Sequence, residues 1–151
     1  MDEVIRPARP QESEAVARLV DDAYGHYVQR IGKKPGPMLD DYAAQVAAGR
    51  VWVLPEPDGR LSGILVLQPV EGGLLLDNVA VAPAAQGRGI GRRLIDFAAA
   101  EARRRGHGAL DLYTHALMTE NIALYARLGF VETRRVSEKG FERVYMRLDL
   151  A

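Results

Sequence analysis

Three glycines at alternate positions, Gly87, Gly89 and Gly91, separate an extended apolar segment from an arginine-rich stretch that is predicted to be helical. The amino terminus of a helix has unpaired backbone N–H groups and a partial positive charge, so it binds anions when the preceding backbone can approach them. Glycines leave that approach open, and Arg88 and Arg92 add cations. The turn therefore fits a pyrophosphate. The alternative is a turn that needs glycine for its backbone angles alone.

Two common phosphate-binding patterns do not match this turn. A Walker loop needs Lys-Ser or Lys-Thr after its glycines, and neither pair follows here. A Rossmann fingerprint needs a glycine three places after Gly89, where the chain has Arg92, and too few residues remain for a dinucleotide-binding fold. The ligand must be identified from other segments.

Hydrophobic periodicity and turn residues predict the elements that position this turn, in the order β-α-α-β-β-β-α-β-α-β-β. The expected strands cover residues 4–5, 51–54, 61–70, 74–81, 110–113, 131–135 and 144–148. The first helix is expected from residue 10, with an apolar face formed by Val16, Leu19, Val20, Ala23 and Tyr27. Three more helices are expected at 39–48, 90–105 and 120–128, with a loop at 31–38 and a turn at Lys139 and Gly140.

The composition limits the function classes. At 151 residues the chain is long enough for one domain with its own core, and a single domain over residues 1–151 is expected. With no cysteine, disulfides, thiolate metal sites and a cysteine acyl intermediate are excluded. A net charge of zero predicts neither nucleic-acid binding nor membrane binding. The first residues lack the apolar core of a signal peptide, so a cytoplasmic location is expected.

Two sequence motifs identify a family resemblance. Residues 86–91, Gln-Gly-Arg-Gly-Ile-Gly, have the form Gln/Arg-x-x-Gly-x-Gly/Ala, and residues 120–130 read Glu-Asn-Ile-Ala-Leu-Tyr-Ala-Arg-Leu-Gly-Phe. Together with the order of elements, these motifs resemble the GNAT superfamily of acyl-CoA-dependent N-acetyltransferases over nearly the whole chain. The resemblance implies an α/β (α+β) fold with a mixed, mostly antiparallel sheet of about seven strands, about four flanking helices, and splayed central strands that hold the cofactor.

The resemblance also implies where acetyl-CoA, the co-substrate, is bound. The backbone of Val79 and Val81 matches the strand that pairs with the pantetheine arm, and Asn121 matches a residue that contacts the pantetheine or the cofactor backbone. The pyrophosphate is expected on the turn formed by Gln86, Gly87, Arg88, Gly89, Ile90, Gly91 and Arg92. Tyr125 matches the residue near the cofactor sulfur.

The expected chemistry needs a base and an acid. An amine with a pKa of ~10 is mostly protonated at pH 7, so a carboxylate or a water chain must take its proton before it attacks a thioester. Asp77 lies where some relatives carry a glutamate base, and His115 and water are the alternatives. A backbone N–H near Val79 could stabilise the tetrahedral intermediate. Tyr125 is expected to protonate the leaving thiolate, while also packing in the core.

Two functions stay open at this stage. The first is direct transfer of the acetyl group of acetyl-CoA to a primary amine of a small molecule, an amino acid or a peptide, and the second is a non-catalytic acyl-CoA-binding module. The acceptor is expected near Tyr24, Tyr27 and residues 30–42 and 137–141. Asp40 and Asp41 either attract a cationic amine or support a helix start, and Lys33 and Lys34 either attract a carboxylate or face solvent. A homodimer is also left open. The histidines, His26, His107 and His115, lack metal-ligand spacing, so no metal is expected.

Overall fold

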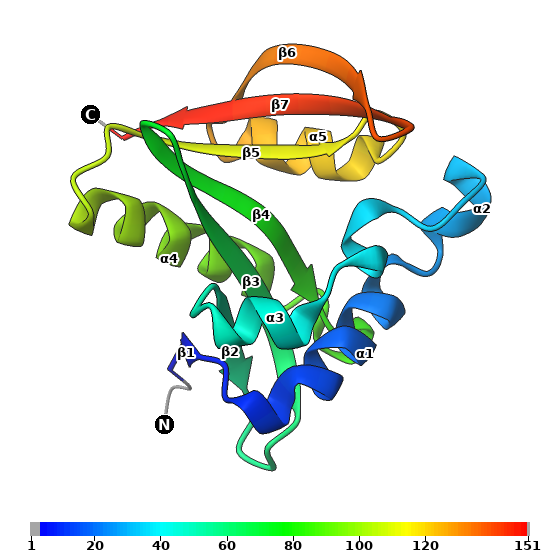
Figure 1. Ribbon diagram of the computed structural model, residues 1–151, viewed down its shortest axis with the longest axis vertical. Helices are drawn as coiled ribbons and strands as arrows, with labels where there is room; N and C mark the ends of the chain where they lie inside the picture. Colours follow the sequence, from blue (N-terminus) through cyan, green and yellow to red (C-terminus); the bar gives the residue numbers. More distant parts are fainter. Residues whose placement is uncertain (1–3, 151) are drawn as a thin grey trace.

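A computed structural model describes residues 4–150 (Figure 1). Their seven strands form one sheet in the order β1-β2-β3-β4-β5-β7-β6. The bounds are β1 (Arg6–Pro7), β2 (Val51–Pro55), β3 (Leu61–Val70), β4 (Gly73–Val81), β5 (Ala109–His115), β6 (Val131–Glu138) and β7 (Phe141–Asp149). Strands β4 and β5 are parallel, and the other described neighbours are antiparallel. The mixed, mostly antiparallel sheet confirms the expected fold class.

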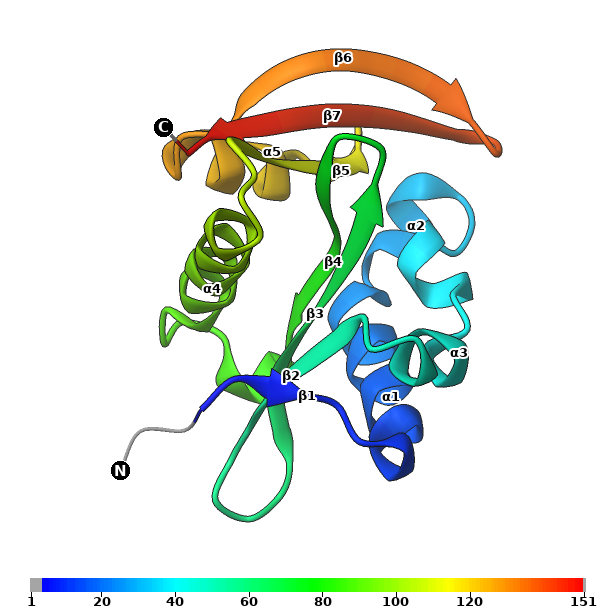
Figure 2. The ribbon, with the colours of Figure 1, turned by 60° about the vertical axis from the view of Figure 1, so that its left-hand side comes forward.

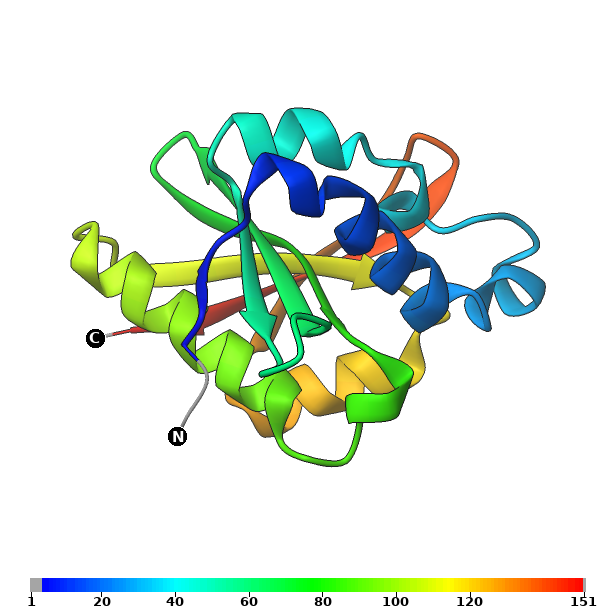
Figure 3. The same ribbon diagram turned by 90° about the horizontal axis from the view of Figure 1, so that it is seen from below.

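Helices cover both faces of this sheet (Figures 2 and 3). One face carries α1 (Ser13–Tyr24), α2 (Tyr27–Ile31) and α3 (Tyr42–Ala47), and the other carries α4 (Ile90–Arg104) and α5 (Thr119–Arg127). Three short 3-10 helices complete the described elements, namely η1 (Pro10–Glu12), η2 (Gly36–Leu39) and η3 (Pro83–Ala85). The covered sheet separates two hydrophobic cores, one on each face.

Strand β3 shows how one apolar sequence fills both cores. Successive side chains of a strand point to opposite faces, and a strand that is covered on both faces reads as a continuous apolar run. Leu65 and Leu67 lie in the core under α4, whereas Ile64 and Val66 lie in the core under α1 and α3. Each of these four side chains is at most 1% exposed.

The amino-terminal third differs from the sequence prediction in its boundaries. The first strand was expected at residues 4–5, but β1 is Arg6–Pro7, because those residues pair with Val53 and Trp52 of β2. Tyr27 was assigned to the first helix, but α1 ends at Tyr24 and Tyr27 begins α2. The structure therefore has five α-helices where about four were expected.

The segment around residues 31–48 is also corrected. The expected loop at 31–38 contains the end of α2 and most of η2, and the helix expected at 39–48 begins at Tyr42. It begins there because the Asp41 side chain caps it, accepting a 3.0 Å hydrogen bond from the backbone N–H of Ala44. Residues 1–3 and 151 of the predicted single domain lie outside the described residues. Across residues 4–150, no helix is long and apolar enough to cross a membrane.

Candidate active site

The parallel strands β4 and β5 separate partway along their length (Figure 1). Their pairing among the described residues is confined to Leu75 with Asp111 and Leu76 with Leu112. Beyond these pairs β4 continues toward the glycine turn while β5 runs to His115. The separation confirms the expected splayed central strands and leaves an edge of β4 without a strand partner.

A β-bulge marks the point of separation. Along β3, Val66 pairs with Asn78 and the next residue, Leu67, pairs with Leu76, so Asp77 is an extra residue on β4. A bulge bends its strand and re-aims the side chain that it carries. It also changes which residues of β4 face the core under α4. That core contains Leu74 and Leu76 before the bulge, and it is packed by Val79 and Val81 after it.

Three neighbouring spaces that share lining residues surround the bulge. A groove between α1, α4 and α5 is lined by Tyr24, His26, Tyr27, Val79, Val81, Gln86, Gly91, Glu120, Asn121 and Tyr125. An inner cavity shares Tyr24, Val79 and Tyr125 with this groove and adds Asp77, Tyr113, His115, Met118, Phe141 and Arg143. An outer cavity shares Asp77, Tyr113, Phe141 and Arg143 with the inner one and adds Asp40, Gln45, Gln68 and Lys139. Asp77 and Tyr125 both line the inner cavity.

The glycine turn forms the far end of the groove. Gly87 and Gly89 have φ angles of 84° and 76°, and a Cβ atom on either would meet nothing within 4 Å. Gly89 is the amino cap of α4, and no side chain caps the first-turn N–H groups. These open N–H groups, on a helix of 15 residues, fit the predicted pyrophosphate site.

The polar side chains of the turn differ in how firmly contacts with the protein hold them. Arg88 forms an ion pair with Glu56 and also donates to the carbonyl of Ala85, so its cation is held beside the turn. Gln86 is exposed and its amide lies 3.5 Å from the carbonyl of Val81. Arg92 is exposed in the first turn of α4. A bound anion would thus meet backbone donors first and mobile cations second.

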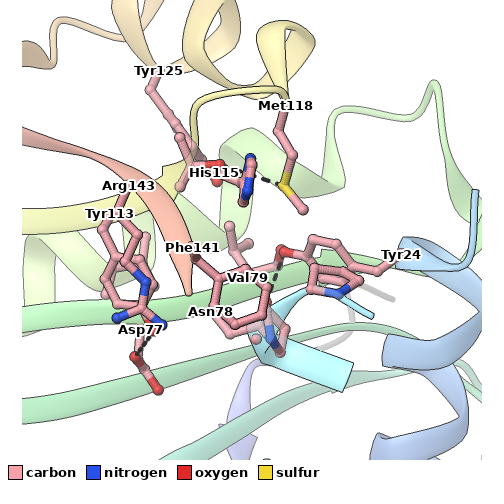
Figure 4. Close-up of a pocket in the computed structure, with 15 residues that line it drawn as sticks. Tyr24, Asp77, Asn78, Val79, Tyr113, His115, Met118, Tyr125, Phe141 and Arg143 are labelled. Carbon is pink, nitrogen blue, oxygen red and sulfur yellow. Dashed lines mark hydrogen bonds between the residues drawn. The ribbon is translucent and has the colours of Figure 1, made fainter. Parts of the chain in front are cut away.

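Asp77 and Tyr113 form a pair in the inner cavity (Figure 4). The Tyr113 hydroxyl donates a 2.8 Å hydrogen bond to the carboxylate of Asp77. Burial raises the pKa of Asp77 above its ordinary value, the Tyr113 hydrogen bond acts against this rise, and the charge of Asp40 adds to it. A carboxylate with a raised pKa is a stronger base than an exposed one.

A hydrogen-bonded chain fixes the wall of the cavity opposite α5. The Tyr24 hydroxyl lies 2.8 Å from Oδ1 of Asn78 and 2.9 Å from the carbonyl of Val79. The Asn78 amide donates to the Tyr42 hydroxyl at 3.0 Å, and that hydroxyl donates to the carbonyl of Pro37 at 2.6 Å. The chain ties α1, α3 and η2 to β4 immediately after the bulge. It holds the main chain on which Asp77 stands.

Tyr125 projects from α5 into the space shared by the groove and the inner cavity. Its ring packs against Phe130, which confirms a core role, and the residue is 5% exposed. Among residues 4–150, no group forms a hydrogen bond with its hydroxyl. Burial raises the pKa of Tyr125, so the hydroxyl is protonated at neutral pH. An unused donor at this place fits a role toward a ligand atom.

His115 is less suited to act as a base. Its Nδ1 accepts a 3.0 Å hydrogen bond from the backbone N–H of Leu117, so the neutral ring carries its proton on Nε2 and presents a donor there. Burial lowers the pKa of His115, which favours this neutral form. Of the candidate bases, the geometry favours Asp77.

Two contacts join α2 to α5 beside the groove. Arg30 of α2 forms a 2.6 Å ion pair with Glu120 of α5, and it also donates to the carbonyl of Leu117. The Tyr27 hydroxyl lies 3.3 Å from the same Glu120 carboxylate. We call Arg30, Tyr27 and Glu120 the clasp. Tyr27, expected near the acceptor, thus lies on the groove side.

Sequence reasoning missed Tyr113 and Arg143. Leu76 pairs with Leu112 in the parallel ladder, and Asp77 and Tyr113 are the next residues on their strands. Extending this register by one residue would have placed the side chains of Asp77 and Tyr113 together. Arg143 gives no comparable signal, because its position depends on the pairing of β7 with β5. No group of three metal-ligating side chains occurs within the described part of the chain.

Comparison with known proteins decides the family. Residues 47–132 match the model of the acetyltransferase (GNAT) domain. The chain belongs to the GNAT acetyltransferase family. It is 29% identical to the uncharacterised N-acetyltransferase YjgM of Escherichia coli over 84% of this chain and 81% of that protein. It is 36% identical to a mycothiol acetyltransferase of Jonesia denitrificans over 58% of this chain, and this match spans 24% of that protein.

Solved structures share the fold of this GNAT chain. A GNAT-family acetyltransferase from Desulfovibrio desulfuricans has a TM-score of 0.77 and 22% identity, with 98% of this chain and 99% of that chain covered. YncA from Salmonella typhimurium, solved with acetyl-CoA, has a TM-score of 0.71 and 24% identity, with 100% and 95% covered.

Proposed function

We propose that this chain is an acetyl-CoA-dependent N-acetyltransferase that acts on a primary amine. One observation carries the proposal. Asp77 lies on the bulge where β4 and β5 separate, and its carboxylate accepts a hydrogen bond from Tyr113. It lines the same cavity as Tyr125, whose hydroxyl has no hydrogen-bond partner among residues 4–150. A base and an acid on opposite sides of one cavity are what amine acylation requires.

The groove fits acetyl-CoA, which supplies the acetyl group as a thioester. The open N–H groups at Gly89 and the first turn of α4 would bind the pyrophosphate, with Arg92 beside them. Val79, Val81 and Asn121 line the groove between that turn and Tyr125. We propose that the pantetheine arm follows this path past Val79, Val81 and Asn121 to the inner cavity.

Side chains of the protein then accept and donate the protons of the reaction. Asp77 takes a proton from the ammonium form of the acceptor, and its raised pKa makes this easier than for an ordinary aspartate. The Tyr125 hydroxyl donates a hydrogen bond, and then its proton, to the departing sulfur. A backbone N–H near Val79 remains the proposed donor to the carbonyl oxygen. The attacking nitrogen loses its second proton as the thiol leaves, and this proton restores the Tyr125 hydroxyl directly or through solvent, while Asp77 releases the first proton to solvent.

A thiol-release assay tests the proposal. Purified protein and acetyl-CoA are incubated with a panel of amines, amino acids and peptides, and free CoA thiol is measured. Turnover is expected with at least one primary amine, and Asp77→Asn should reduce it by roughly 10²-fold or more. Asp111→Asn is the matched control, because Asp111 lies on the neighbouring strand and pairs with Arg147 outside the three spaces.

The same experiment distinguishes the N-acetyltransferase function from the alternative function. Binding of acetyl-CoA without turnover on any amine would support an acyl-CoA-binding module instead.

We also propose that residues 1–151 act as one domain, and a single cooperative thermal transition is expected.

A further inference from the structure

The outer cavity carries both signs of charge. Its carboxylates are Asp77 on the bulge of β4 and Asp40, which precedes α3. Its cations are Arg143 on β7 and Lys139 in the turn before that strand. All four charged groups are close enough for Asp40, Arg143 and Lys139 to change the pKa of Asp77. A cavity with two kinds of charge suits a ligand that also carries both.

Arg143 has donors that the protein does not use. Its Nη1 donates to Glu138 at 3.0 Å, and its guanidinium lies 4.4 Å from the centre of the Tyr113 ring. Its side chain is 12% exposed. Within residues 4–150, neither Nε nor Nη2 has a hydrogen-bond partner. Both nitrogens reach the solvent of the cavity, since neither is a buried unpartnered atom, and they are therefore open to a charge-assisted pair with an external carboxylate.

Glycine keeps space open beside the free edge of this guanidinium. A Cβ atom on Gly36 would lie 3.5 Å from Nη2 of Arg143. Gly36, Asp77, Tyr113 and Arg143 line both the inner and the outer cavity. The unfilled donors and the base therefore border the same connected space (Figure 4).

Two segments meet beside Phe141, which lines both the inner and the outer cavity. Lys33, which follows α2, donates to the carbonyl of Gly140 at 2.5 Å and lies 4.4 Å from the centre of the Phe141 ring. The segment after α2 is thus fastened to the β6–β7 turn, and Figures 1 and 2 show the two side by side. This arrangement favours a compact acceptor over a polypeptide chain.

We propose that the acceptor is a small amino carboxylate, a molecule that carries a primary amine and a carboxylate together. Its amine lies at Asp77, and its carboxylate is bound by Nε and Nη2 of Arg143, with Lys139 beside them. The inference rests on the proposed N-acetyltransferase function. It adds the requirement that the acceptor carries an acid group. Arg143 selects for this group and does not take part in the proton transfers.

Matched substrate pairs test this requirement. The wild-type protein is assayed with glycine, alanine, β-alanine, γ-aminobutyrate and lysine, each against its carboxamide. For the preferred acceptor, kcat/KM should be at least roughly tenfold higher for the acid than for the amide, because a charge-assisted pair is lost in the amide. The proposal would be overturned if kcat/KM for every amide equalled or exceeded kcat/KM for its acid. It would also be overturned if kcat/KM for an alanine-terminated peptide amide equalled or exceeded that for the preferred acid. No turnover on any amine would instead refute the proposed function.

A variant then assigns the preference to its residue. Arg143→Gln should bring the acid-to-amide ratio of kcat/KM close to one, and Arg143→Lys should restore part of it. Arg147→Gln is the matched control on the same strand, because Arg147 pairs with Asp111 outside the cavities, and it should leave the ratio unchanged. If Arg143 merely supports the fold, kcat/KM will fall equally for the acid and the amide substrate, and the acid-to-amide ratio will not change. If Arg143→Gln does not fold, the wild-type substrate pairs alone decide.

Discussion

The Tyr113 hydroxyl donates a 2.8 Å hydrogen bond to the Asp77 carboxylate across the point where β4 and β5 separate. A donor to the charged form lowers the pKa of an acid, whereas burial and the nearby charge of Asp40 raise it. The pKa of the proposed base is therefore a balance between neighbours, and two of these neighbours can be changed separately.

Opposite pH shifts are expected when these two neighbours are changed. Asp77 accepts a proton only when ionised, so kcat/KM falls as the pH drops through its pKa. Tyr113→Phe removes the bond that lowers this pKa, so the acidic limb should move to higher pH. Asp40→Asn removes a charge that raises it, so the limb should move to lower pH. The pH profile of kcat/KM measures both shifts.

Asp41→Asn serves as the control for the pH profiles. Asp41 caps α3 and is not among the residues that line the cavities, so its replacement should leave the acidic limb in place. Shifts in the same direction for Tyr113→Phe and Asp40→Asn, or none in either, would point to water as the base.

Tyr125→Phe should reduce turnover more than cofactor binding. The ring and its packing on Phe130 are kept and the hydroxyl alone is lost, so kcat should fall at least roughly tenfold. The dissociation constant of acetyl-CoA should change less than about threefold, since a transition-state contact is removed. A single-turnover measurement shows whether slow product release hides the effect. A large rise in the dissociation constant with unchanged kcat would make Tyr125 a binding residue.

Gly89→Val should block acetyl-CoA binding. A Cβ atom at Gly89 has free space in the protein alone, so any steric obstruction would be toward the ligand. Gly72→Val is the control, because Gly72 has nearly the same φ angle, 75° against 76°, in a turn outside the groove. Both variants should lose similar thermal stability from backbone strain. Calorimetric titration should show a loss of at least roughly tenfold in affinity for Gly89→Val, and unchanged binding would remove the pyrophosphate from this turn.

Arg30→Met should open the clasp. Exposed ion pairs are worth at most about 1 kcal/mol, so acetyl-CoA should dissociate no more than about fivefold faster. The hydrogen bond from Arg30 lowers the pKa of Glu120 to about 2, so the pair stays charged at neutral pH and salt should weaken it. Stopped-flow displacement measures the rate. Arg60→Met, which breaks an exposed pair with Asp58 in the β2–β3 hairpin, should leave it unchanged.

The sequence predicted the parts of the site that local chemistry determines. The turn at Gly87 and Gly89 is recognisable because positive φ angles and open backbone are glycine properties. The end of α5 at residue 127 and the left-handed Gly129 follow the same logic. The family motif indicated Tyr125, which lies on α5 and lines the groove, and its role toward the cofactor sulfur stays a prediction.

The bulge and the cation could not be predicted in the same way. Asp77 and Asn78 are flanked by the continuous apolar runs 74–76 and 79–81, which show no alternation, so periodicity does not reveal that Asp77 is an extra residue. Arg143 reaches Tyr113 through strand pairing between segments that are 30 residues apart, which local patterns do not encode. The expected helix began at residue 39 with Asp40 and Asp41 in its first turn, whereas Asp41 is the amino cap and Asp40 precedes it in extended backbone.

The bulge in β4 makes the length of this strand as important as its composition. Adding one residue between Leu76 and Asn78, with the bulge kept, would reverse the alternation after it, and the side chains of Val79 and Val81 would then turn away from the core under α4. Both residues would still be present, but on the wrong side of the sheet. Natural or engineered variants of this protein should therefore tolerate substitutions at these positions far better than a single insertion.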